Sequence, residues 1–448
     1  MIESSQTDLL GVQRQQKKIT GRTLSAVLVA STLFVLFGNG LLFVHKNGAV
    51  FQHLRFASAF VGSVLSGKFI DIIGRKCTIF MALIFYLLGY IFALLSWQTS
   101  IFSKDTSTIF CFIGAMYYGV GVGMTSLVVP IYIAEISSPN LRGLMGVMCN
   151  NALLLGACLL LVIDVEFPSS LYFNNIIGIS FSLLGFLIIL MPETPRWLLT
   201  QNRRDEALKN LFWLSGELHD AEDQCVDIQI SVEHQQIVSV NDYRSLGLFR
   251  PLFIGSLLCF IQQFIYHQYS FNFQKFLEVK IVALPLFLLL QTLLALLGCI
   301  LVHAFRRRPL FMSGSAFLFL YSIIIATYYQ IKRNFNGTTQ YTTVFYGIAF
   351  TLSWGPLPWI IFSEIFPPRA RGTFGSIAIS AYWLLNNVRY LITNWLIENE
   401  KFSFWLLSGI YLISIPLIYF IVPETKGKTL EEIEHYYIMH RTFRNYLF

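Results

Sequence analysis

The sequence predicts an all-α membrane protein in which twelve transmembrane helices form two six-helix repeats, with a cytoplasmic helical segment between them. Hydrophobic residues make up 55% of the chain and charged residues only 13%, whereas a soluble domain carries roughly 25% charge. The phrase Glu-Ile-x-x-Pro-x-x-Arg-Gly occurs twice, beginning at Glu135 and at Glu364. A parallel internal duplication in a membrane protein is typical of two-halved transporters.

Apolar segments of about 20 residues, the length needed to span a bilayer, recur along the chain. The longest polar stretch, residues 200–248, separates them into two sets of six. The expected spans are 24–45, 54–73, 77–97, 108–134, 142–165, 170–191, 249–272, 280–304, 309–331, 342–366, 371–398 and 402–422. The chain then divides into a tail (1–23), a six-helix bundle (24–191), an intracellular helical segment (192–248), a second bundle (249–422) and a tail (423–448).

The distribution of lysine and arginine predicts the orientation. With the N-terminus inside, the inner loops and tails hold about 22 of the 32 basic residues and the outer loops about 8. The positive-inside rule then places both termini in the cytoplasm, and we expect the plasma membrane as the location. The basic residues are dispersed among loops, so we predict the lipid bilayer, and no nucleic acid, as a partner. Asn336 begins an Asn-Gly-Thr sequon in a predicted outer loop, where glycosylation can occur.

Duplicated charges fall at the predicted cytoplasmic ends of the spans. Isolated charges would only mark helix ends in water, but charges that recur with one spacing in both halves favour ion pairs between helices. Such pairs would hold the halves together at one face and break when the halves rock apart. The predicted latch residues are Asp71, Arg75, Lys76, Glu135, Arg142, Glu193, Arg196, Glu364, Arg371 and Glu424.

Neutral amides occur inside several predicted spans, where unpaired polar groups are costly. A sugar hydroxyl both donates and accepts, so a sugar site needs amides, together with an aromatic face for the ring. The sequence Gly355-Pro356-Leu357-Pro358 breaks the tenth span beside Trp359, and broken helices mark binding sites in transporters. The alternative for each amide is a bridge between two packed helices.

Several motifs together resemble the sugar-porter branch of the major facilitator superfamily, over residues 24–435. The chain is similar to eukaryotic facilitative glucose transporters. This resemblance implies the fold of the superfamily, an alternating-access mechanism and a sugar substrate. The segments that carry it are Gly67-Lys68-Phe69-Ile70-Asp71-Ile72-Ile73-Gly74-Arg75-Lys76, Pro130-Ile131-Tyr132-Ile133-Ala134-Glu135, Pro192-Glu193-Thr194-Pro195-Arg196-Trp197-Leu198, Gly355-Pro356-Leu357-Pro358-Trp359 and Pro423-Glu424-Thr425-Lys426-Gly427.

The resemblance also implies which side chains bind the sugar. Two glutamines match the family's paired glutamines, and three residues match its binding positions in the tenth and eleventh spans, while the other amides differ from the family in length. The implied residues are Asn150, Gln262, Gln263, Gln268, Gln291, Trp359, Trp383 and Asn386. Because Tyr266 stands where glycine is usual and Thr351 where glutamate is frequent, we expect an altered substrate preference.

Proton-coupled members of the family carry an aspartate and an arginine where this chain has Gly40 and Ala115. A membrane carboxylate is the group that could take up and release a proton, so its loss predicts facilitated diffusion of a hexose-like sugar. The turn from His303 to Arg308 departs from the family's acidic turn, and we expect weaker pairing there. Arg389 lies within the eleventh span and is expected to snorkel to the outer face.

Two alternatives stay open: a transporter of another polyhydroxyl solute, such as a polyol or a disaccharide, and a transport-dead sugar sensor. The chain shows no nucleophile–base pair, no nucleotide-binding motif and no metal-ligand spacing among its seven cysteines. We therefore predict neither an enzyme nor a bound metal or cofactor.

Overall fold

A computed structural model describes most of the chain, and every regular element in the described residues is a helix. The predicted all-α class is therefore confirmed. The described residues are 20–42, 49–98, 103–166, 170–236, 249–279, 283–331, 339–367 and 370–444.

The first half contributes six long helices, the last of which continues as a short 3-10 helix. They are α1 (Gly21–Leu42), α2 (Ala49–Ile73), α3 (Arg75–Leu95), α4 (Lys104–Ile136), α5 (Arg142–Glu166), α6 (Ser170–Gly185) and η2 (Phe186–Leu190). α4 begins earlier than its apolar segment because Ser103 caps it: the Ser103 hydroxyl accepts a hydrogen bond from the N–H of Thr106 at 3.3 Å.

The second half repeats the arrangement with one helix broken. Its helices are α11 (Phe249–Val279), α12 (Ala283–Ala304), α13 (Arg307–Ile331), α14 (Thr339–Leu352), α15 (Leu357–Ile365), α16 (Arg371–Glu398) and α17 (Glu400–Ile421). The predicted tenth span is α14 and α15 with a turn between them. Pro356 and Pro358 cause the break, because proline has no N–H to continue a helix but fits its first turn.

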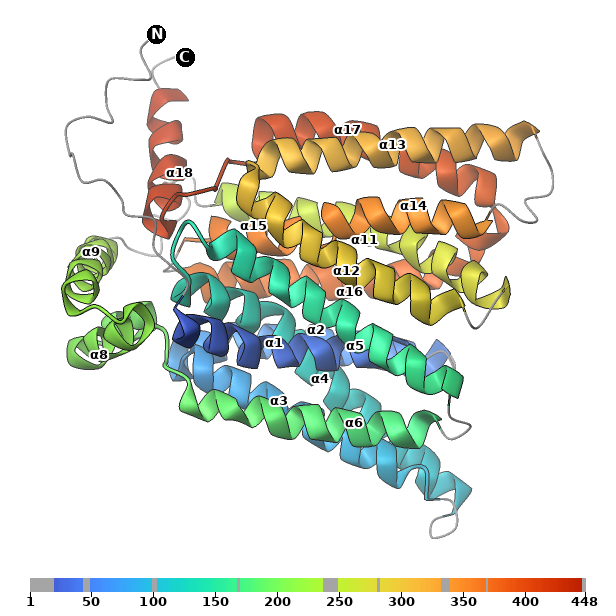
Figure 1. Cartoon of the computed structure of the whole chain (residues 1–448), viewed down its shortest axis with the longest axis horizontal. Coiled ribbons are helices and arrows are strands. Elements are labelled where there is room, and N and C mark those ends of the chain that lie inside the picture. Colours follow the sequence, from blue (N-terminus) through green and yellow to red (C-terminus); the bar gives the residue numbers. More distant parts are fainter. Residues whose placement is uncertain are drawn as a thin grey trace.

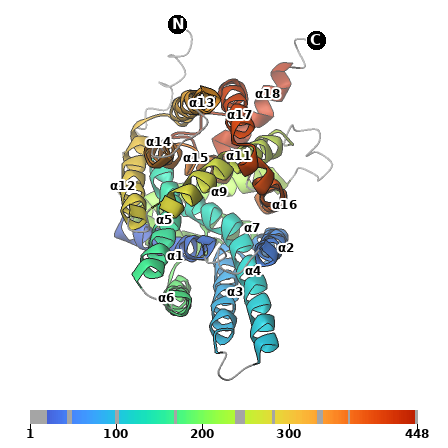
Figure 2. The same cartoon turned by 90° about the vertical axis from the view of Figure 1, so that its right-hand side faces the viewer.

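The two sets of long helices lie side by side with their axes along one direction (Figures 1 and 2). The main contacts between the sets are made by α2 with α16 and by α5 with α12. α2 and α12 occupy equivalent places in the duplication, as do α5 and α16. The two contacts are therefore related by the internal repeat.

Glycines allow helices of one half to approach closely. A Cβ at Gly38 in α1 would overlap the backbone oxygen of Leu153 in α5, and one at Gly156 in α5 would overlap that of Val35 in α1. Small residues at such crossings let backbones pack directly, which is how helices associate in a bilayer.

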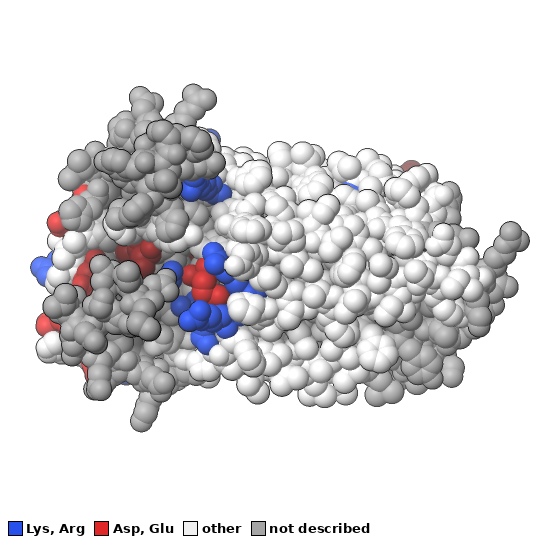
Figure 3. Space-filling model, turned by 90° about the horizontal axis from the view of Figure 1, so that it is seen from above, with Lys and Arg blue, Asp and Glu red and all other residues white. Residues whose placement is uncertain are grey.

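Nine described helices are long and apolar enough to cross a membrane, and α11 and α12 contribute shorter apolar stretches, Phe249–Ile265 and Leu289–Ala304. Large apolar side chains face outward, such as Phe253 (61% exposed) and Phe420 (79% exposed). Figure 3 shows this surface as a broad band almost free of charged atoms. An apolar band of this extent suits contact with lipid rather than water.

Shorter helices lie at one end of the long-helix bundle (Figure 1). They are α7 (Pro195–Thr200), α8 (Arg204–Ser215), α9 (Leu218–Gln236) and α18 (Leu430–Arg444). The first three share a small apolar core that includes Trp197, Leu211 and Cys225. Charged residues gather at this end (Figure 3), which we call the charged end; the opposite end of the bundle is the far end. Within the predicted helical segment 192–248, helices are present up to Gln236, and residues 237–248 lie outside the described part.

Candidate functional site

A buried ion network joins the two halves at the charged end. Glu135, at the end of α4, lies 3.0 Å from Nε of Arg75, the first residue of α3. The other oxygen of Glu135 lies 2.8 Å from Nη1 of Arg371, the first residue of α16. The side chains of Glu135 and Arg371 are fully buried. One carboxylate therefore binds an arginine of its own half and an arginine of the other half.

The second half repeats the pair within itself. Arg307, the counterpart of Arg75, donates through Nη2 to Glu364 at 3.0 Å, and both side chains are buried. Arg307 lies in the turn where we expected weaker pairing, and Glu364 has this one arginine as its ion-pair partner, whereas Glu135 has two. The turn has lost its acidic residue but kept the arginine that makes the contact.

Carboxylates also cap two helices in equivalent positions. Glu193 accepts hydrogen bonds from the backbone N–H groups of Arg75 and Lys76 at 3.2 and 2.9 Å, at the start of α3. Glu424 accepts from the N–H groups of Arg307 and Arg308 at 3.0 and 3.1 Å, at the start of α13. A negative charge is favoured at a helix N-terminus. Burial nevertheless raises the pKa of Glu193 above its ordinary value, since desolvation outweighs these donors.

Two further predicted latch residues break the symmetry of the network. Arg142, the counterpart of Arg371, donates to the backbone oxygens of Ala134 and Lys428 at 2.9 and 3.3 Å. Asp71 of α2 lies against the first turn of α16, where a Cβ at Gly372 would overlap its carboxylate. His303, the counterpart of Asp71, is exposed. The crossing between halves therefore depends on Glu135 and Arg371 more than on their counterparts.

Arg196 connects α7 to α18. Its Nη2 lies 2.8 Å from Oε1 of Glu431, and its Nη1 donates to the backbone oxygen of Glu135 at 3.4 Å. Burial alone would raise the pKa of Glu431, but the nearby charge of Arg196 holds it below its ordinary value. The C-terminal helix is thus joined to the ion network of the first half.

The paired glutamines of α11 reach the broken helix. Gln262 donates through Nε2 to the backbone oxygen of Trp354, in the break, at 3.0 Å. Gln263 donates through Nε2 to the backbone oxygen of Tyr382 in α16 at 3.4 Å, and its own Oε1 is buried without a hydrogen-bond partner. These two amides lie where three helices of the second half meet.

Asn150 of α5 approaches the same break from the other half. A Cβ at Gly355 would lie 3.1 Å from its Oδ1, in tight contact. Its Nδ2 is buried and has no hydrogen-bond partner. A buried donor without a partner is costly, and a bound ligand could satisfy it.

Aromatic rings fill the space between the halves beside these amides. Trp359 of α15 lies edge-on to Phe34 of α1, with ring centroids 6.2 Å apart, and also contacts Tyr382 at 5.5 Å. Trp383 of α16 lies 5.7 Å from Phe37 of α1, and its ring nitrogen donates to Ser126 of α4 at 3.1 Å. The two predicted tryptophans therefore both reach across to the first half.

The remaining predicted binding residues have different surroundings. Gln291 is buried in α12. Asn386 is buried in α16, where its Oδ1 accepts from Nε and Nη2 of Arg389 at 3.1 and 2.8 Å. Arg389 is only 9% exposed, so the expectation that it snorkels to the surface is wrong. The side chain of Gln268 and the sequon residue Asn336 lie outside the described part of the chain.

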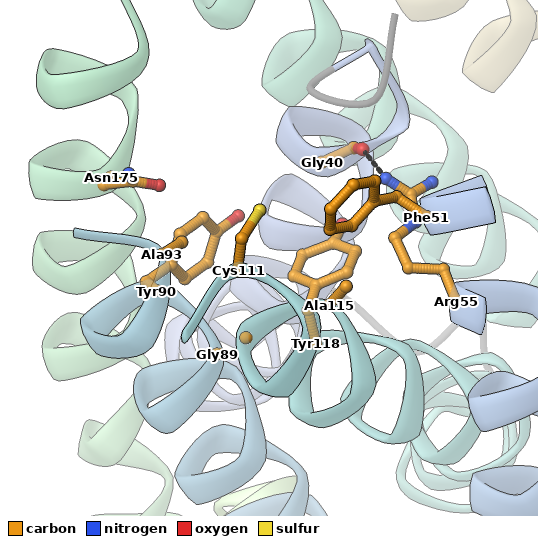
Figure 4. A pocket seen from close by; sticks show the side chains of 11 residues that line it. Gly40, Phe51, Arg55, Gly89, Tyr90, Ala93, Cys111, Ala115, Tyr118 and Asn175 are labelled. Carbon is orange, nitrogen blue, oxygen red and sulfur yellow. Dashed lines mark hydrogen bonds between the residues drawn. The ribbon is translucent and has the colours of Figure 1, made fainter. Parts of the chain in front are cut away.

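Sequence reasoning passed over a buried arginine in α2. Arg55 donates through Nη1 to the backbone oxygen of Gly40 at 2.6 Å and lies 5.3 Å above the ring of Tyr118 (Figure 4). Gly40 is near the end of α1, whose last carbonyls lack partners within the helix, so Arg55 caps it. Arg55 falls at the edge of a predicted span, and its position in the sequence gave no sign of this cap.

Arg55 and Tyr118 lie against Gly40, the position where proton-coupled members of the family carry an aspartate. A Cβ at Gly40 would overlap the Tyr118 hydroxyl, which donates to the backbone oxygens of Leu36 and Phe37 at 2.9 and 3.0 Å. The adjoining cavity, lined by Gly40 and Ala115, has about 30 Å³ of free volume (Figure 4). That volume is far too small for a sugar.

Comparison with known proteins places this geometry in context. The family model described as "Sugar (and other) transporter" matches residues 46–437. Sugar transporter ERD6-like 2 of Arabidopsis thaliana is 31% identical over 397 residues, which cover 84% of this chain and 82% of that protein. Facilitated trehalose transporter Tret1 of Bombyx mori is 27% identical over 402 residues, covering 84% of this chain and 76% of that protein.

Solved structures share the fold. The proton:xylose symporter XylE bound to 6-bromo-6-deoxy-D-glucose has a TM-score of 0.81 at 22% identity, covering 93% of this chain and 99% of that one. The inward open conformation of XylE from E. coli has a TM-score of 0.64 at 23% identity, covering 92% and 99%. The likeness supports the predicted fold of twelve transmembrane helices in two repeats.

Proposed function

Because the chain belongs to the sugar transporter family of the major facilitator superfamily, we propose that it carries a hexose across the membrane by facilitated diffusion. The observation that carries this proposal is the group of amides and rings beside the break between α14 and α15. Gln263 and Asn150 each bring a buried polar atom without a partner to this place, from different halves. Such atoms can bond sugar hydroxyls, while Trp359 and Trp383 offer ring faces to the sugar.

The charged end is proposed to face the cytoplasm, in line with the positive-inside rule. There the Glu135–Arg371 contact would hold the halves closed and would break when the halves rock apart. The sugar would then leave on that side. The same network would re-form once the empty site faces outward again.

The placement of acidic side chains supports facilitated diffusion rather than proton coupling. Among the described side chains of the long helices, the carboxylates lie at helix ends: Asp71, Glu135 and Glu364 at the charged end, and Asp105 in the first turn of α4. At Gly40, where proton-coupled relatives carry an aspartate, the charged contact is made by Arg55. An arginine side chain does not release its proton in a protein. The described side chains of the long helices thus offer no midspan carboxylate that could carry a proton.

A disaccharide is the second candidate substrate, because relatives from Bombyx mori and Apis mellifera ligustica carry the name facilitated trehalose transporter. The two candidates share the same mechanism and differ in the length of the solute. A transport-dead sensor would keep binding but show no uptake.

The experiment is uptake into liposomes that carry the purified protein, with labelled D-glucose, trehalose and, as a control, L-glucose. We expect saturable entry of D-glucose that stops at equal concentration on both sides. Entry of trehalose alone would select the second candidate. Binding without entry of either sugar, in protein shown to be folded, would identify a sensor.

The site itself is tested with Gln262→Ala and Trp359→Ala. Each should lower kcat/KM for uptake at least about tenfold, equivalent to roughly 1.4 kcal/mol. Matched controls are Gln229→Ala, a half-buried glutamine of α9 far from the break, and Trp405→Ala, at an exposed position of α17. Uptake that survives in the site variants would remove the site assignment while leaving the transport activity itself in place.

A further inference from the structure

Arg389 fixes the orientation of the neighbouring amide. Its Nε and Nη2 lie 3.1 and 2.8 Å from Oδ1 of Asn386, and both side chains are buried. A guanidinium has donors only, so the atom that faces it must be the amide oxygen. The NH2 group of Asn386 therefore points away from Arg389.

Asn386 lies on the face of α16 that meets the first half. It is one helical turn from Trp383 and one turn from Tyr390, so the three side chains share a face. Phe56 of α2 contacts the rings of both, at centroid distances of 6.2 Å from Trp383 and 6.0 Å from Tyr390. The amide of Asn386 is thus set within the aromatic cluster between the halves.

The paired glutamines of α11 are fixed with the opposite polarity. The backbone oxygens of Trp354 and Tyr382 can only accept, so they hold the Nε2 groups of Gln262 and Gln263. The Oε1 atom of Gln263 is left buried and unpartnered. α11 therefore offers an unpartnered acceptor beside α16, whereas Asn386 of α16 offers a donor.

We propose that Arg389 is a positioning residue that makes Asn386 a pure hydrogen-bond donor to the sugar. This inference rests on the proposed function. One sugar hydroxyl accepts from Asn386, and a different hydroxyl donates to Gln263. A sugar is therefore selected by which of its hydroxyls can accept from Asn386 and which can donate to Gln263, and not merely by having hydroxyls at these positions.

The test is inhibition of D-glucose uptake in proteoliposomes by the deoxy and deoxyfluoro analogues of D-glucose at each ring position. Fluorine can accept a hydrogen bond but cannot donate one, whereas a hydrogen substituent does neither. At one ring position the fluoro analogue should inhibit nearly as well as D-glucose, and the deoxy analogue about 3- to 10-fold more weakly, the range of one net hydrogen bond.

Three variants test the role of Arg389. Arg389→Met frees the amide to turn its oxygen toward the sugar, so the fluoro-over-deoxy preference should shrink while KM rises and the maximal rate stays within about twofold. Arg389→Lys keeps a donor and should restore part of the preference. Asn386→Asp keeps the partner of Arg389 but offers acceptors only, so the fluoro analogue should be rejected while D-glucose still binds. Lys68→Met, at an exposed position of α2, is the matched control.

Each result has a defined meaning. An unchanged fluoro-over-deoxy preference in Arg389→Met or in Asn386→Asp would overturn the positioning role while leaving hexose transport intact. If Arg389→Met fails to fold, Asn386→Asp alone decides, because it retains the arginine. Wild-type protein that neither takes up D-glucose nor is thermally stabilised by it would overturn the proposed hexose function together with this inference.

Discussion

The two ends of the bundle join the halves by different chemistry. At the charged end, Glu135 is shared by arginines of both halves and is fully buried. Toward the far end, His53 of α2 hydrogen-bonds Asn387 of α16 and packs edge-on against Tyr390, so this contact contains no carboxylate. A buried ion that loses its partner costs about 3–5 kcal/mol, whereas a neutral hydrogen bond contributes about 1 kcal/mol. The charged end should therefore open in an all-or-none manner, and the far end more easily.

The largest effect is expected from Glu135→Gln, which leaves Arg75 and Arg371 buried without a carboxylate. We expect the closed state to lose about 3–5 kcal/mol. Cys149 is 2% exposed and lines a small cavity beside the latch with Arg142 and Trp359, so it reports opening. Its alkylation, located by mass spectrometry, should be much faster in the variant.

The matched control for that experiment is Glu222→Gln, which removes an exposed carboxylate of α9. It should leave the alkylation of Cys149 as in the wild type. Equal alkylation in Glu135→Gln and the wild type would contradict a latch held by this carboxylate.

A smaller effect on opening is expected from Glu364→Gln. Glu364 contacts Arg307 of its own half, and Arg142 donates to backbone oxygens instead. The substitution should lower the thermal stability in detergent by about 3 kcal/mol, because a buried arginine loses its partner. It should speed Cys149 alkylation clearly less than Glu135→Gln. Equal acceleration by the two substitutions would show that both halves contribute alike to the crossing.

At the far end, His53→Phe and Asn387→Leu each remove the hydrogen bond between these two side chains. In a double-mutant cycle on thermal unfolding, we expect a coupling energy of about 1 kcal/mol, the value of one hydrogen bond. Strictly additive effects of the two substitutions would mean that this contact does not join the halves. A coupling as large as that of the ion network would erase the contrast between the two ends.

The smallest effect concerns Glu431, whose side chain is 24% exposed beside Arg196. Its pKa is lowered in the folded protein, so its contribution is present above the ordinary value near 4.3 and is lost as the pH falls through the lower folded value. Solvent screening limits that contribution to less than about 1 kcal/mol. Glu431→Gln should therefore unfold at a lower temperature than the wild type at pH 7, and the difference should shrink on acidification below pH 4. A difference that grows with acidification would contradict this sign.

Sequence reasoning succeeded where the chain repeats itself. The phrase repeated at Glu135 and Glu364 marked both carboxylates, and the structure places both in buried ion pairs at one end. The repeat could not tell which pairs cross between halves, because Arg142 and Arg371 occupy the same position of the repeated motif. Their different partners arise only when the halves pack.

Residues that occur once were harder to find. Arg55 and His53 lie at the edge of an apolar segment, and nothing in their spacing indicates the carbonyl or amide that each contacts. The break beside Trp359 could be predicted, because proline and glycine act locally. The orientation of the Asn386 amide could not, because it depends on the burial of Arg389.

The most direct test of the account is uptake of labelled D-glucose into proteoliposomes with and without an imposed pH gradient. A site of amides and rings, in long helices whose described carboxylates lie at helix ends, predicts saturable entry that stops at equal concentration in both conditions. Accumulation above the external concentration when the outside is acidic would contradict facilitated diffusion and would require a proton carrier elsewhere in the chain.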